Sequence, residues 1–135
     1  MTQEDKDLLL RDLCARLPYG VKGVEATTLC SLNTVTRFKS IVKNIEYKIE
    51  HLGFKPYLFP LSSMTEEQKK FFKDRPIFLD SENELVVKED FFGNSQFTML
   101  EDWVEVVLWL VKNHFDIYGL IEKGLAIDCT NLNIY

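Results

Sequence analysis

A chain of 135 residues is long enough to bury one hydrophobic core and too short for two domains of ordinary size. Its hydrophobic fraction of 46% and aromatic fraction of 13% supply enough large apolar side chains for that core, which excludes an intrinsically disordered chain. The formal net charge of -5 argues against a general phosphate-binding surface, because such a surface needs clustered lysines and arginines.

Acidic residues concentrate in the second half of the chain. Residues 1–60 carry nine Lys and Arg against seven Asp and Glu, whereas residues 61–135 carry seven against fourteen. The second half could therefore offer a negatively charged surface to a partner, while the first half has enough lysines and arginines for a local basic patch.

The sequence gives no sign of export or membrane insertion. The first residues, MTQEDKDLLL, lack the features of a signal peptide. The longest strongly apolar run, residues 104–111, is far shorter than the roughly 20 residues of a membrane-spanning helix. Cys14, Cys30 and Cys129 are an odd number of cysteines without a CxxC pair, which is typical of reduced thiols. We therefore expect a soluble, cytoplasmic protein with no membrane association.

Residues 2–17 are predicted to form a helix. Thr2 can accept a hydrogen bond from the amide three residues later, and the acids near it suit the positive end of the helix dipole. Leu9, Leu10, Leu13 and Leu17 form one apolar stripe, and Pro18 ends the helix. Such a stripe could bind a partner, but a helix this short usually buries it, so we expect it to face the protein's own core.

The next part of the chain is predicted to be β-rich. Residues 21–32 contain Val, Thr, Leu and Cys in the proportions typical of a strand. Residues 35–54 fit two patterns: apolar residues recur at helical spacing, yet residues 45–49 alternate between apolar or aromatic and charged, as in a half-buried strand. Because β-branched and aromatic residues dominate, we expect two strands that break near residues 43–44.

The segment KPYLFPLSSMTEEQKKFF, residues 55–72, joins a proline-broken apolar run to a helix start. Pro56 and Pro60 should keep the chain extended and exclude it from a central strand position. Thr65 and Gln68 form a capping box, which predicts that a short helix follows. A ligand site or docking loop would also fit the aromatic residues, but we interpret the segment as the connection between two parts of one domain.

Residues 77–92 are predicted to form two short strands around the acidic turn SENE. Thr98 and Glu101 form a second capping box, which would open a largely buried helix that runs to about Asn113. A short helix near residues 120–123 and an apolar tail follow.

Together these elements predict one α+β domain over residues 1–135, with a small, mostly antiparallel sheet packed against two or three helices. Residues 1–60 should form a helix and a β-rich part, and residues 61–135 a helix-rich acidic part. The sequence contains no internal repeat that would indicate a solenoid.

Three blocks of the sequence stand out together: LLLRDLCARLPYGVK (8–22), KPYLFPLSSMTEEQKK (55–70) and NHFDIYGLIEKGLAID (113–128). They resemble the signature blocks of an uncharacterised family of small proteins from gut Bacteroidales, often found in prophages and other mobile elements. In that family the third block usually reads FDYRGLIEKGLA, whereas Ile-Tyr stands here at 117–118, so no role of that arginine carries over. The resemblance implies a mobile-element origin and a β-segment at residues 44–52. It implies no activity, catalytic residue, cofactor or partner.

The sequence contains no recognised catalytic or metal-binding motif. His51 and His114 could each serve a nucleophilic cysteine, but no local signature of such enzymes surrounds any of the three cysteines. His114 lies near the end of the predicted helix, where its charge would interact favourably with the helix dipole. The acidic loop at residues 80–84 lacks the ligand spacing of a calcium loop. We therefore assign no catalytic, metal or cofactor-binding residue.

The best candidate for nucleic-acid contact is RFKSIVKNIEYK, residues 37–48. Basic residues alternate there with aromatic ones, and exposed aromatics on a basic sheet can stack on bases. The candidate contact residues are Arg37, Lys39, Lys43, Tyr47 and Lys48. The simpler interpretation is that the lysines protect an edge strand from aggregation, and the net negative charge of the protein favours it.

Three functions follow from these observations, in order of preference. The first is a non-enzymatic accessory protein of a prophage or mobile element that acts by binding a protein partner. The second is a nucleic-acid-associated module that uses residues 37–48. The third is a small enzyme.

Overall fold

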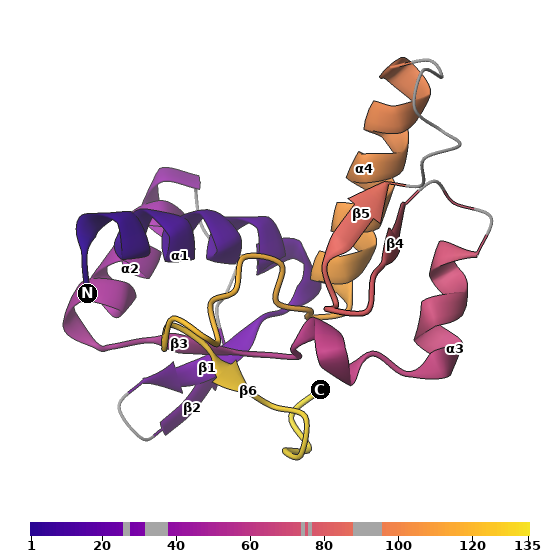
Figure 1. Ribbon diagram of the computed structural model, residues 1–135. Helices are drawn as coiled ribbons and strands as arrows, with labels where there is room; N and C mark the ends of the chain where they lie inside the picture. Colours follow the sequence, from indigo (N-terminus) through magenta and orange to yellow (C-terminus); the bar gives the residue numbers. More distant parts are fainter. Residues whose placement is uncertain (26–27, 32–37, 74, 76, 88–95) are drawn as a thin grey trace.

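The computed structural model describes residues 1–25, 28–31, 38–73, 75, 77–87 and 96–135, with the backbone alone for 28–31, 38–42, 87 and 96–100 (Figure 1). These residues form an α+β fold, as predicted. Its helices and strands are α1 (Gln3–Arg16), β1 (Lys22–Glu25), β2 (Thr28–Ser31), α2 (Phe38–His51), β3 (Lys55–Leu58), α3 (Glu66–Lys69), β4 (Ile77–Leu79), β5 (Leu85–Val87), α4 (Gln96–Lys112) and β6 (Ile127–Asp128). Short 3-10 helices occupy Leu17–Tyr19 (η1), Leu61–Ser63 (η2) and Lys70–Phe72 (η3).

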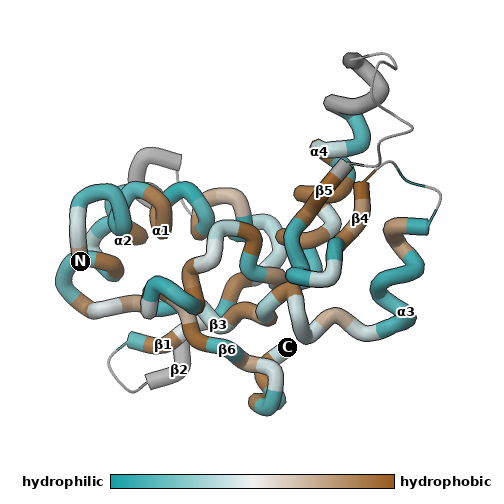
Figure 2. Tube along the Cα trace, in the orientation of Figure 1, coloured by the Kyte–Doolittle hydropathy of each residue, from teal (hydrophilic) through white to brown (hydrophobic). Residues whose placement is uncertain are grey.

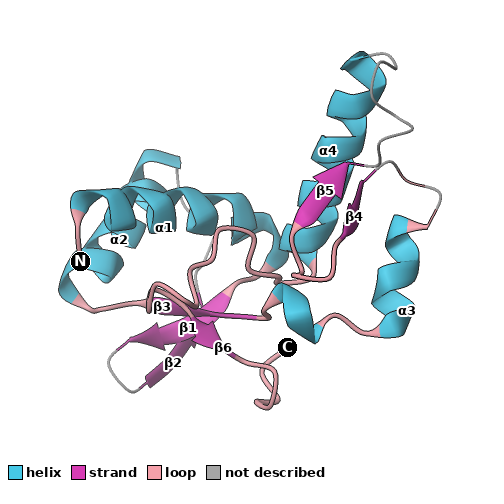
Figure 3. Ribbon diagram, viewed as in Figure 1, coloured by secondary structure: helices cyan, strands magenta, loops and turns pink. Residues whose placement is uncertain are grey.

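The main sheet has four strands in the order β2-β1-β3-β6, and α1 and α2 lie together on one of its faces (Figure 3). β1 pairs antiparallel with β2 and β3, while β6 pairs parallel with β3. A separate antiparallel pair, β4-β5, packs beside α4 at the other end of the molecule. The sheet is therefore mostly antiparallel, with one parallel edge.

Helix α1 forms as its sequence predicts. The Thr2 hydroxyl accepts from the Asp5 amide at 3.1 Å, and the Asp5 carboxylate accepts from the Thr2 amide at 3.3 Å, which completes a capping box. Leu9 and Leu13 are fully buried. The leucine stripe therefore faces the protein's own core, as expected.

Strand β3 contradicts the expectation that its prolines exclude a central position. β1 pairs with its first half, through Pro56 and Lys55, and β6 pairs with its second half, through Tyr57 and Leu58. Because the strand is so short, the missing amide of Pro56 removes few hydrogen bonds from its pairing with either neighbour. A proline is therefore tolerated between two strands here. Gly23 stands opposite Pro56 in β1, and a Cβ there would lie 2.4 Å from the Phe54 ring, which requires glycine.

Residues 38–51 form helix α2, so the prediction of two strands in 35–54 was wrong. Ile45 and Ile49, one turn apart, are buried at 1% and 4% exposure, while Tyr47 between them is 55% exposed. Residues 45 and 49 would lie on the same face in a strand, where side chains alternate with period two, and also in a helix, where four residues make about one turn. The packing of this segment against α1 favours the helix. Gly53, at a φ of 61°, ends the helix.

The second part of the chain begins with η2 and the α3–η3 helix. The Thr65 hydroxyl accepts from the Gln68 amide at 3.1 Å and the Gln68 side chain accepts from the Thr65 amide at 2.9 Å, so the predicted capping box is present. The predicted turn joins β4 to β5, and residues 88–92 of the expected second strand lie outside the described residues.

Helix α4 begins at Gln96, two residues before the predicted cap Thr98, which is therefore inside the helix. The helix is also less buried than expected: Val106 and Leu110 are fully buried, but Val104 and Leu108 are 51% and 50% exposed. The reason is that β4, β5 and η3 contribute the side chains that pack against one side of the helix. Figures 1 and 2 show the β4–β5 pair beside α4. Residues 120–124 form turns and no helix, which corrects the last helix prediction.

The buried apolar side chains form two clusters. The first lies between the four-stranded sheet and α1 and α2, and the second lies among η2, η3, β4 and α4. Leu120, Leu125 and Ala126 return to the first cluster after the chain has left α4. The C-terminal segment thus packs with the N-terminal helices, and the two clusters belong to one fold.

Candidate functional site: an acidic groove beside a buried polar centre

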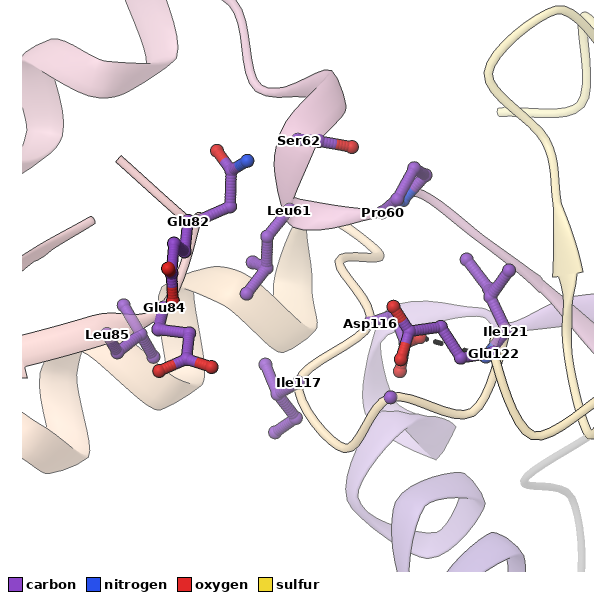
Figure 4. A pocket seen from close by; sticks show the side chains of 12 residues that line it. Pro60, Leu61, Ser62, Glu82, Glu84, Leu85, Asp116, Ile117, Ile121 and Glu122 are labelled. Atoms are coloured by element: carbon purple, nitrogen blue, oxygen red, sulfur yellow. Dashed lines mark hydrogen bonds between the residues drawn. The ribbon is translucent and has the colours of Figure 1, made fainter. Parts of the chain in front are cut away.

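A groove with a volume of about 520 Å³ separates the β4–β5 turn from the loop that follows α4 (Figure 4). The 3-10 helix η2 is the third segment that lines the groove. The lining residues are Pro60, Leu61, Ser62, Glu82, Asn83, Glu84, Leu85, Asp116, Ile117, Gly119, Ile121 and Glu122. The groove thus combines acidic side chains with an apolar floor.

The β4–β5 turn forms one wall, and Asp80 fixes its shape. One carboxylate oxygen of Asp80 accepts from the amides of Glu82 and Glu84, both at 2.9 Å. Asn83 adopts a φ of 61° within the turn, a conformation that asparagine tolerates. The carboxylates of Glu82 and Glu84 stay exposed on the groove side of the turn (Figure 4).

Asp116 fixes the opposite wall. Asp116 is buried, with 7% exposure, and its carboxylate accepts hydrogen bonds from the amides of Leu120 and Ile121 at 2.9 and 3.0 Å. Its own amide donates to the Phe59 carbonyl at 2.8 Å. Asp116 therefore serves the loop structure, while Glu122, which the loop presents, is exposed.

The groove carries the negative charges of Glu82, Glu84 and Glu122. Within the part of the chain that the structure describes, none of Glu82, Glu84 and Glu122 takes part in an ion pair. Among the described residues, no group of three or more His, Cys, Asp or Glu side chains converges as a metal site would require. Carboxylates on two walls can attract a cationic group that spans the groove.

A buried ion pair lies at the base of the neighbouring loop. Arg16, fully buried at the end of α1, binds the Asp12 carboxylate in a bidentate pair at 2.7 and 2.9 Å and donates to the Phe115 carbonyl at 2.6 Å. Burial raises the pKa of Asp12, and the hydrogen bond and charge of Arg16 oppose that shift. The sequence prediction did not include this pair: a spacing of four residues indicates a helical ion pair, but it does not indicate that the pair is buried.

His114 lies beside this pair and does not act as a charged helix cap. Its ring stacks on Tyr135 with 3.5 Å between centroids, and its backbone has a φ of 66°. Burial, followed by the charges of Arg16 and Lys22, lowers the pKa of His114 to about 4. The imidazole is therefore neutral at pH 7, which corrects the expected interaction of its charge with the helix dipole.

The described cysteine side chains are poor nucleophiles. Burial and Asp128 raise the pKa of Cys129 to about 11, and burial and Glu46 raise the pKa of Cys14. Both thiols are therefore protonated at neutral pH. The side chain of Cys30 lies outside the described part of the chain.

The five residues predicted for nucleic-acid contact do not form one described surface. Arg37 lies outside the described residues, and Lys39 is placed by its backbone alone. Lys43 and Tyr47 are exposed one turn apart on α2, on a helix rather than a sheet. Lys48 instead pairs with Glu25 of β1.

Comparisons of the chain with protein-family models, curated proteins and solved structures find no match. Among the described helices, none is long and apolar enough to cross a membrane.

Proposed function

We propose that the protein is a non-enzymatic accessory protein of a prophage or mobile element, and that its acidic groove binds a basic segment of a partner protein. The observation that carries the proposal is the position of three exposed carboxylates, those of Glu82, Glu84 and Glu122, on two walls of one groove. The mobile-element origin is supported by the resemblance of the three sequence blocks.

A short peptide with alternating basic and apolar residues suits this groove. Its volume of about 520 Å³ falls in the range of ligand pockets, about 300–1,000 Å³. The aliphatic stem of a lysine or arginine can cover Leu61 and Ile117 while its charged end reaches a carboxylate. Exposed ion pairs contribute about 0.2–1 kcal/mol each, so apolar contacts must supply the rest of the affinity.

The charges of the molecule favour a protein partner over nucleic acid. The groove would repel phosphate, and on α2 the exposed Lys43 is accompanied by exposed Glu46 and Glu50. The raised thiol pKa values of Cys14 and Cys129 also favour binding over Cys-His catalysis. We expect the protein to pass through a heparin column at low salt.

The test is the binding of a fluorescent peptide of alternating lysine and leucine, measured by anisotropy at low and high salt. The triple variant Glu82→Gln, Glu84→Gln, Glu122→Gln should lose about tenfold in affinity, since three exposed charge contacts of about 0.5 kcal/mol each together amount to about 1.5 kcal/mol. A peptide with glutamate in place of lysine should not bind.

The matched control removes the same charge elsewhere, with Glu4→Gln, Glu46→Gln and Glu67→Gln, three exposed acids outside the groove. It should bind the lysine peptide nearly as well as the unmodified protein. Equal losses in the two triple variants would show that net charge, and not the groove, attracts the peptide, and would overturn the proposal.

A further inference from the structure

Helix α4 carries an exposed stripe that the groove does not use. Val104 and Leu108, one turn apart, are 51% and 50% exposed, and the stripe continues through exposed charged residues at both ends. The helical repeat places its members on one side: Glu101, Val104, Glu105, Leu108 and Lys112. The opposite side of α4 holds Val106 and Leu110 in the second apolar cluster.

Within the described part of the chain, nothing packs over the two apolar residues of this stripe. Figure 1 shows that much of α4 rises beside the β4–β5 pair and away from the four-stranded sheet. Among the described residues, neither Val104 nor Leu108 belongs to either buried cluster or to the side chains packed against it. The outer face of α4 therefore presents two exposed apolar side chains, with Glu105 between them and a charged residue at each end.

We propose that the stripe pairs with the same stripe of a second copy, with the two α4 helices antiparallel about a two-fold axis. In that orientation the acidic end of one stripe faces the basic end of the other. The stripe is acidic at Glu101, apolar at Val104 and Leu108, and basic at Lys112. With the axis near the level of Val106, Val104 lies opposite Leu108 of the second copy and Glu101 lies opposite its Lys112.

Parallel pairing would place like charges together. Glu101 would meet Glu101 and Lys112 would meet Lys112, which is unfavourable. Glu105, the charged residue nearest the proposed axis, is already paired with Arg75 of its own chain at 2.8 Å. Arg75 is held in place by its hydrogen bond to the Phe71 carbonyl at 2.7 Å and by the Phe71 ring. The Glu105 charge is thus compensated before the second copy arrives.

The contact is small, so the dimer is weak. From residue 101 to residue 112 a helix rises about 16 Å, and stable interfaces bury about 800 Å² on each partner. The dimer should therefore form and dissociate with concentration. The proposal does not depend on peptide binding, because the lining of the groove includes no residue of the stripe.

Sedimentation velocity over a wide concentration range tests the proposal. The unmodified protein should show a concentration-dependent shift from monomer to dimer. Leu108→Glu should raise the dimer dissociation constant about tenfold or more. The control is Leu132→Glu, at an exposed leucine outside the stripe with 46% exposure, and it should dimerise as the unmodified protein does. A monomer at all concentrations, or a dimer that Leu108→Glu leaves unchanged, would overturn the inference.

A charge exchange tests the antiparallel orientation. Glu101→Lys and Lys112→Glu should each weaken the dimer, because each places like charges opposite one another at both ends. The double variant should restore it, since opposite charges face one another again. If both single variants weaken the dimer and the double variant does not restore it, antiparallel pairing is contradicted. Circular dichroism should show the same helix content in all variants.

Discussion

The guanidinium of Arg16 donates a 2.6 Å hydrogen bond to the main-chain carbonyl of Phe115, which lies 99 positions further along the chain. Arg16 ends α1, whose leucines fill the first apolar cluster, whereas the Phe115 ring lies in the second. One buried side chain therefore joins the two clusters, and its loss should be felt in both.

Arg16→Ala should lower the free energy of unfolding by about 3–5 kcal/mol, because it leaves the Asp12 carboxylate buried without its partner. Urea denaturation followed by circular dichroism measures the loss. The double variant Asp12→Leu, Arg16→Met should recover much of it, since an apolar pair can replace a buried ion pair.

The control for Arg16 is Arg11→Ala, at an exposed position on the same helix. It should change the free energy of unfolding by no more than about 0.5 kcal/mol. A loss in Arg16→Ala as small as that of the control would contradict the role given to the buried pair.

The pKa of His114 near 4 predicts a loss of stability in mild acid. Its ordinary value is 6.5, so the unfolded chain takes up a proton before the folded protein does. The contribution of this group is fully present above the unfolded pKa and falls as the pH drops from about 6.5 towards 4. The free energy of unfolding should therefore decrease over this interval.

His114→Asn removes the titrating ring at a residue whose φ of 66° asparagine tolerates. Its free energy of unfolding should change less between pH 7 and pH 5 than that of the unmodified protein. His51→Gln, at an exposed position, should retain the full change. An identical pH dependence in the His114 variant and the unmodified protein would refute the assignment.

Gly23→Ala should destabilise the protein by about 3 kcal/mol, the upper part of the usual range for overpacking. The new Cβ would lie 2.4 Å from the Phe54 ring and 2.5 Å from the Lys55 carbonyl oxygen, so β1 and β3 must move apart. Urea denaturation gives the free energy, and faster amide exchange at Val24 would locate the change.

Gly124→Ala provides the comparison for Gly23. No atom lies within 4 Å of its added Cβ, and its φ of 73° costs about 1–2 kcal/mol. We expect it to leave amide exchange in β1 unchanged. Rapid exchange in β1 for both variants would point to general destabilisation rather than to a steric conflict between two strands.

Asp80→Ala should weaken peptide binding indirectly, because Asp80 itself makes no contact with the peptide. It removes the acceptor of the Glu82 and Glu84 amides, so the turn that presents both carboxylates loses its fixed shape. Losing these bonds should cost about 1 kcal/mol of stability and reduce peptide affinity in the anisotropy assay. Ser81→Ala, at the next residue, should bind as the unmodified protein does.

Short-range signals in the sequence were sufficient for several elements. The capping boxes at Thr2 and Thr65 depend on residues three positions apart, and the structure confirms both. The acidic turn between β4 and β5 is likewise encoded locally, by Asp80. In each case the partner groups are neighbours in the chain, so the sequence contains the whole interaction.

Features that depend on tertiary packing were not predicted. The alternation around Tyr47 fits a strand and a helix equally, and the leucines of α1 decide between them. The groove brings Glu84 and Glu122 together from segments far apart in the sequence, and no local pattern records this. Asp12 and Arg16 resemble a surface pair until the loop at Phe115 covers them.

Two backbone hydrogen bonds connect the segment before η2 to the loop after α4: the Phe59 amide donates to the His114 carbonyl, and the Asp116 amide donates to the Phe59 carbonyl, both at 2.8 Å. No hydrogen bond among the described residues connects either segment to the β4–β5 turn. A segment bound in the groove would thus meet one wall held by hydrogen bonds between distant segments and one wall held by hydrogen bonds within its own turn. Because the two walls carry carboxylates at different positions, the order of charges along the bound segment would contribute to its selection.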